Sequence, residues 1–138
     1  MKEVFTKPVA LFIPLVEGMD ARCLTNLSHD ELEDIVFQCK EALDSRIYQQ
    51  NPDILIRNVG DEWVMVPTGE LAQRFNGMIS LNIFSQFVWQ QFDEQPHSEG
   101  EVLQAARMQF DDPEHMLDVQ VRKLISDFAR MGLLLKNT

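Results

Sequence analysis

The stretch that decides the fold runs from Met65 to Trp89 and reads MVPTGELAQRFNGMISLNIFSQFVW. Its Asn76-Gly77 pair is typical of a tight turn, because both residues accept a positive φ. Residues 78–81 are too few for a helix and favour a strand, after which Asn82 can cap a helix with its side-chain oxygen. The stretch therefore predicts a strand, a turn, a short strand and a capped helix, and it holds no catalytic constellation.

The flanking sequence completes a sheet and a set of helices. Residues 54–59 and 63–66 are rich in β-branched and aromatic residues and favour two strands around a turn at residues 60–62. Two more helices follow the one at Asn82: one starts at a Ser98–Glu101 capping box, and the last has Asp112 as N-cap and stops at Gly132. The expected fold class is α+β, similar to a winged helix-turn-helix: a three-stranded antiparallel sheet followed by three helices.

An N-terminal extension precedes this core and contains one amphipathic helix. Residues 28–47 favour that helix, because Ser28 and Glu31 form a capping box and apolar residues recur at helical spacing behind it. Such a stripe usually packs on the chain's own core, and partner binding is the alternative. The apolar run at residues 9–16 favours a strand at a sheet edge because it contains Pro14. Asn51-Pro52 then breaks the pattern, which divides the chain into an extension (residues 1–52) and a core domain (residues 53–138).

Charge and cysteine content narrow the function classes. The 138 residues carry 12 Lys and Arg against 22 Asp and Glu, a formal net charge of −10. This balance disfavours nucleic acid and anionic membranes as partners, since both are bound through basic residues. The apolar run at residues 9–16 is too short to span a bilayer and is a poor signal sequence. Cys23 and Cys39 lack a CxxC neighbour, so we expect a cytoplasmic protein with reduced thiols.

The chemistry-bearing residues do not form a recognisable active site. His29, His97 and His115 are scattered, and none has a second ligand at helical spacing. The chain has no P-loop, GxGxxG or GxSxG motif. Trp63 and Trp89 sit among apolar residues and are expected in the core. The sequence therefore predicts no enzyme activity, no metal and no cofactor.

Residues 54–135 resemble the family of pyrroloquinoline quinone biosynthesis protein D, the PqqD-like proteins or RiPP recognition elements. The resemblance rests on five motifs taken together: VPTGE at 66–70, FNGMISLN at 75–82, FVW at 87–89, the Ser98-x-x-Glu101 helix start, and FARMGLL at 128–134. It implies a peptide chaperone that holds the leader segment of a ribosomally made precursor peptide. Such proteins present the leader to a modifying enzyme, often a radical SAM protein.

The resemblance also implies where the leader binds. The leader adds as a strand beside the third strand, in a cleft walled by the third helix of the core. On this sequence the strand edge corresponds to Gly77, Met78, Ile79, Ser80 and Leu81. The wall comes from some of Val121, Leu124, Ile125 and Phe128, and periodicity alone does not separate those that face the cleft from those that face the core.

Two other functions and one regulatory arrangement stay open at this point. The protein is alternatively an interaction adaptor that docks a partner through the helix at residues 28–47 and binds no leader. A DNA-binding winged helix is a third reading, which the net charge opposes. Residues 9–16 have the right length to cover the strand edge themselves, in cis or in an exchanged homodimer.

Overall fold

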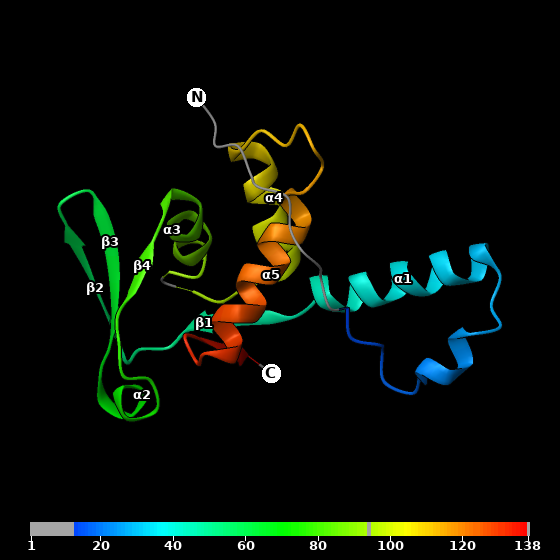
Figure 1. Cartoon of the computed structure of the whole chain (residues 1–138), viewed down its shortest axis with the longest axis horizontal. Coiled ribbons are helices and arrows are strands. Elements are labelled where there is room, and N and C mark those ends of the chain that lie inside the picture. Colours follow the sequence, from blue (N-terminus) through cyan, green and yellow to red (C-terminus); the bar gives the residue numbers. More distant parts are fainter. Residues whose placement is uncertain (1–12, 94, 138) are drawn as a thin grey trace.

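A computed structural model describes residues 13–93 and 95–137 (Figure 1). It has a mixed architecture of helices and two small antiparallel sheets, which confirms the expected α+β class; the likeness to a winged helix-turn-helix stays a prediction. The elements in chain order are η1 (Ala21–Leu24), α1 (His29–Asp44), β1 (Ile47–Gln50), β2 (Ile54–Val59), β3 (Glu62–Pro67), α2 (Gly69–Arg74), β4 (Ile79–Leu81), α3 (Ile83–Gln90), β5 (His97–Ser98), α4 (Glu99–Gln109), α5 (Leu117–Arg130) and β6 (Leu134–Asn137).

The expected three-stranded sheet is present as β2-β3-β4, with β3 in the centre. β2 and β3 are joined by a tight turn in which Gly60 has a φ of 64°, a conformation that favours glycine. Ile56 lies opposite Met65, and Met65 lies opposite Ile79. Because strand side chains alternate between faces, these residues share one face of the sheet, and that face is turned toward the core.

A second sheet, ordered β5-β1-β6, was not predicted from the sequence. Its central strand β1 pairs with the C-terminal strand β6, so that Ile47 lies opposite Asn137 and Gln50 opposite Leu134. β1 uses residues 47–50, at the end of the predicted extension. These residues are therefore tied by backbone hydrogen bonds to the last strand of the core domain.

The helix predicted over residues 28–47 ends three residues early, at Asp44. Ser45 closes it: its backbone N–H and its hydroxyl both donate to the carbonyl oxygen of Glu41. Ile47 and Tyr48 then belong to β1, because both sides of that strand are paired in the sheet. The predicted strand at residues 9–16 falls partly outside the described residues, and the described part, residues 13–16, is not a strand.

Three further expectations about local structure were wrong. The segment between β3 and β4 contains the short helix α2 rather than only a turn, and Gly77 does not adopt a positive φ. The last helix begins at Leu117, not after Asp112. The Asp112 carboxylate does accept hydrogen bonds from backbone N–H groups, those of Met116 and Leu117 at 2.6 and 3.1 Å, but it does so across an irregular turn.

The predicted helix starts at Ser28, Asn82 and Ser98 are confirmed. Asn82 Oδ1 accepts the N–H of Ser85 at 2.7 Å, which ends β4 and starts α3. Ser28 and Ser98 each form a complete capping box with the glutamate three residues later. Gly132, with a φ of 82°, ends α5 as predicted.

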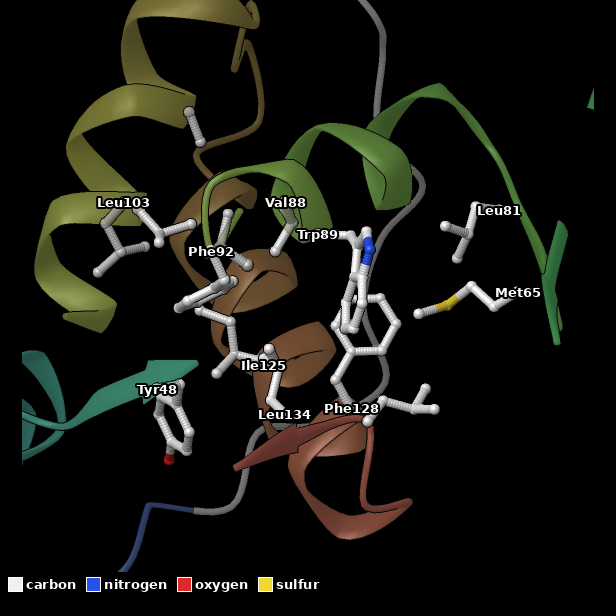
Figure 2. Packing of buried hydrophobic residues seen from close by; sticks show 14 of the residues in the cluster. Tyr48, Met65, Leu81, Val88, Trp89, Phe92, Leu103, Ile125, Phe128 and Leu134 are labelled. Carbon is white, nitrogen blue, oxygen red and sulfur yellow. The ribbon is translucent and has the colours of Figure 1, made fainter. Parts of the chain in front are cut away.

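The core lies between the two sheets and helices α3, α4 and α5 (Figure 2). Trp89 of α3 meets Phe128 of α5 edge to face, with ring centroids 5.6 Å apart. Tyr48 of β1 packs in the same way on Phe92, at 6.3 Å. Met65 of β3 has no exposed surface and extends from the first sheet toward this aromatic centre. One core therefore joins the sheet β2-β3-β4 to the helices that follow it.

Candidate functional site

β4 is an edge strand of the first sheet. It pairs with β3 on one side, and no described residue pairs with its other side. The free side of such a strand carries unpaired N–H and C=O groups that can accept another strand. The edge predicted from the sequence maps onto this strand and the two residues before it. Leu81 is buried, Ile79 is half-buried, and Gly77, Met78 and Ser80 are exposed.

Alternation along β4 gives its two faces different chemistry. Ile79 and Leu81 lie on the core side, opposite Met65 and Trp63 of β3. Ser80 lies on the other side, opposite Val64. The hydrophobic side chains of β4 are thus held by the core, while its backbone lies at the rim of the sheet.

The four predicted wall residues of α5 do not occupy equivalent positions. Val121 and Ile125 have no exposed surface, and Phe128 is as deeply buried in the same cluster. Leu124 is partly buried and packs against that cluster from its margin. The structure thus places three of these side chains in the core and only Leu124 at the surface of the helix.

Contacts of α5 show which way its flanks face. On one flank, Asp118 pairs with Arg107 of α4 at 2.6 Å. On the buried face of α5, the ring of Phe128 contacts Trp89 of α3. Leu124 and Met131 are seven residues apart, hence on one helical face, and both are partly buried against the core.

The residue Gly132, just after α5, lies close to α2, the helix that leads into β4. A Cβ atom placed on Gly132 would lie 3.2 Å from Leu71 Cδ1 of α2. By helical spacing, Leu124 lies on the flank of α5 opposite Asp118, the residue that pairs with α4, and Gly132 just after α5 is close to α2, which precedes β4.

A buried ion-pair cluster holds α5, α4 and α1 together. The guanidinium of Arg122, with only 6% of its side chain exposed, donates to Glu99 Oε2 at the start of α4 and to Asp44 Oδ1 at the end of α1, the latter at 2.6 Å. Burial raises the pKa of Glu99, and the positive charge of Arg122 acts in the opposite direction. Sequence reasoning missed this cluster because its members lie far apart in the chain and carry no local spacing signal.

A hollow lies between β1, β2 and α3. Two adjoining cavities of about 370 and 190 Å³ share Gln50, Ile56 and Trp89 in their walls. The side-chain amide of Gln50 donates to the carbonyl oxygen of Trp89 at 2.9 Å across this space. The walls combine amide and apolar groups with the carboxylate of Asp93, which offers surface for packing and hydrogen bonding. This hollow was not predicted, because it depends on the unpredicted β1.

The described residues show neither a metal site nor a membrane span. Among them, no three His, Cys, Asp or Glu side chains come together in a way that could hold a metal ion. None of the helices in residues 13–93 and 95–137 is both long and apolar enough to cross a bilayer.

Comparison with known proteins gives a similar solved structure and a family. The fold is similar to that of a solved structure, TbiB1 in complex with the TbiA(beta) leader peptide, with a TM-score of 0.52 and 13% sequence identity. The superposition covers 65% of this chain and 98% of that one, and at this identity it shows a shared fold. No curated protein sequence matches the chain. The family model for coenzyme PQQ synthesis protein D (PqqD) matches residues 62–134, more than half of the chain, so the chain belongs to the PqqD family.

Proposed function

We propose that the protein is a recognition module without catalytic activity that binds the leader segment of a ribosomally made precursor peptide. The observation that carries the proposal is the one-sided pairing of β4, which leaves an edge for a guest strand. Family membership supports it, as does the shared fold with TbiB1, which is described in complex with a leader peptide. The bound leader is then presented to a modifying enzyme, for which a radical SAM protein is our first candidate.

In the proposed binding mode the leader lies along β4 and extends the sheet to four strands. Backbone hydrogen bonds to residues 77–81 supply affinity that depends little on leader sequence. Alternate leader side chains then point toward α5, where Leu124 and Met131 offer partly buried apolar surface. Val121, Ile125 and Phe128 are buried in the core cluster and hold α5 in place behind this surface.

The proposed function also includes a cellular location, a set of partners and an oligomeric state. The acidic chain acts in the cytoplasm, where precursor peptides are made, and it needs neither a cofactor nor nucleic acid. A homodimer in which residues 9–16 cover the partner's β4 edge would compete with the leader. Leader affinity that is independent of protein concentration would argue against such an exchanged dimer.

A backbone-methylation scan of the leader tests the binding mode directly. The probe is a synthetic, fluorescently labelled leader segment of a precursor peptide encoded beside this protein's gene. In a β-ladder only every second residue of the guest points its N–H at the host strand. We therefore expect N-methylation to weaken binding at alternate positions and to leave the intervening positions near the unmodified affinity. A uniform effect at every position would overturn strand addition, and the absence of binding would overturn the proposed function.

Variants of the chain test the proposed wall. Replacing Leu124 by Ala removes partly buried apolar surface from the proposed wall, and we expect leader affinity to fall by about tenfold, since one apolar anchor is typically worth about 1–2 kcal/mol in binding. Met108→Ala on α4 is the matched control, because it also truncates an apolar helix side chain, and Met108 is 82% exposed and does not belong to the proposed wall. Equal affinities for the two variants, at equal thermal stability, would remove Leu124 from the site.

A further inference from the structure

Helix α1 carries apolar side chains that the rest of the described chain does not cover. Its C-terminal half is anchored, because Cys39 and Leu43 are buried and Asp44 pairs with Arg122. Its N-terminal half is not, and Leu32, Val36 and Phe37 are 36%, 41% and 61% exposed. Figure 1 shows α1 extending away from both sheets and from helices α2–α5, with its first turns farthest from them.

The exposed turns of α1 are also strongly acidic. The helix contains six carboxylates and only one lysine, Lys40. Glu33 and Glu41 lie four residues before and after Phe37, so at helical spacing they flank its ring on the same face. Asp44 is engaged by Arg122, whereas the other five carboxylates lie on exposed positions: Asp30, Glu31, Glu33, Asp34 and Glu41.

The family fold does not account for this helix. The PqqD model begins at residue 62, well after α1 ends. The shared fold covers 98% of the TbiB1 chain with only 65% of this chain. An exposed helix with one anchored end is weak by itself, because isolated helices of about this length are marginal in water. The capping box and the Asp44–Arg122 pair nevertheless fix its start and its end.

We propose that the free turns of α1 are a docking surface for a basic amphipathic helix of a partner protein. The apolar side of that helix packs against Leu32, Val36 and Phe37, and its lysines and arginines face the surrounding carboxylates. Charge complementarity selects this partner over others. A second copy of the chain would bring two acidic helices together, and an anionic membrane would repel the same face. This surface is separate from the β4 edge and does not depend on leader binding.

The first test measures binding of a defined probe to the full chain. The probe is a labelled, amphipathic helical peptide with leucine along one face and lysine on the remaining positions. We expect the double variant Val36→Ser, Phe37→Ser to bind it at least about tenfold more weakly than the natural sequence, as for the loss of central apolar anchors. Met108→Ser, which removes an exposed side chain on α4, is the control and keeps full affinity. Equal binding by all three proteins would overturn the proposal.

A charge-matched pair of variants separates docking from general attraction. Two double variants each remove two exposed negative charges. Glu33→Gln with Glu41→Gln removes them from α1, and Asp61→Asn with Glu62→Gln removes them from the β2–β3 turn and the first residue of β3. The proposal expects only the α1 variant to lose affinity for the lysine-rich probe. Equal losses of affinity in the two double variants would mean non-specific attraction and would overturn the proposal. Concentration-dependent dimerisation that Phe37→Ser abolishes would also overturn it, because the surface would then bind a second copy of the chain. Leader binding by the α1 variants reports separately on the β4 edge.

Discussion

Arg122 is the residue whose environment most clearly ties separate helices together. It lies almost fully buried on α5 and donates to Glu99 of α4 and Asp44 of α1. Replacing it by Met leaves the buried Glu99 carboxylate without its partner. We expect Arg122→Met to lower the free energy of unfolding by about 3–5 kcal/mol, measured by urea denaturation, as for other broken buried ion pairs.

The control for this prediction is the exposed Arg107–Asp118 pair. Arg107→Met removes a solvent-accessible ion pair whose distance, 2.6 Å, is the same as that between Arg122 and Asp44. It is expected to cost about 1 kcal/mol or less, because water screens exposed pairs. Similar losses for the two variants would show that burial of Arg122 does not make its ion pairs important for stability.

The buried carboxyl group of Glu99 makes the stability of the protein depend on pH. Burial raises the pKa of its carboxyl above the usual value of 4.5, despite the nearby Arg122. As the pH rises from about 4.5 through the raised pKa, the native state retains a proton that the unfolded state has released. Native stability contributed by this group therefore falls with rising pH in that window. The wild type should lose stability relative to Glu99→Gln there, in urea titrations at a series of pH values. A relative gain would mean that the ion pair outweighs desolvation.

At the scale of single elements, the capping boxes make a testable contribution to stability. Ser98 Oγ accepts the N–H of Glu101, and Glu101 Oε1 accepts the N–H of Ser98. Ser98→Ala removes the first of these bonds and is expected to destabilise the protein by about 0.5–2 kcal/mol. Thr68→Ala is a suitable control in the same denaturation experiment, because Thr68 precedes α2 without a side-chain capping bond. An equal cost at both positions would contradict the role of the cap.

The elements that were predicted correctly are those with strong local signals. A capped helix start and the hairpin of β2 and β3 each depend on residues that are close together in the sequence. The sheet that was not predicted depends on pairing between β1 and β6. These strands are far apart in the sequence, and no local pattern marks such a pairing. Asp112 misled the prediction because an aspartate can satisfy backbone N–H groups in an irregular turn as well as at a helix start.

At the scale of the whole molecule, the candidate site was predictable in part. The short β-prone run before Asn82 located β4, because a strand ended by a helix cap is visible in the sequence. Periodicity predicted that α5 has an apolar side, but it did not distinguish Leu124 from Val121, Ile125 and Phe128. That distinction depends on where α3 and α4 pack, and packing is a property of the assembled core.

The distribution of contacts over the molecule predicts that α1 opens independently of the core. α1 and α4 both start at capping boxes, but α4 buries Val102, Leu103 and Ala106, whereas the first half of α1 buries little. Local opening is easiest where few apolar contacts are lost. Amide hydrogen exchange should therefore be much faster at residues 32–37 than at residues 102–107. The basic amphipathic probe should slow exchange at residues 32–37 alone. Protection of α1 equal to that of α4 in the free protein would show that contacts beyond those described stabilise the helix.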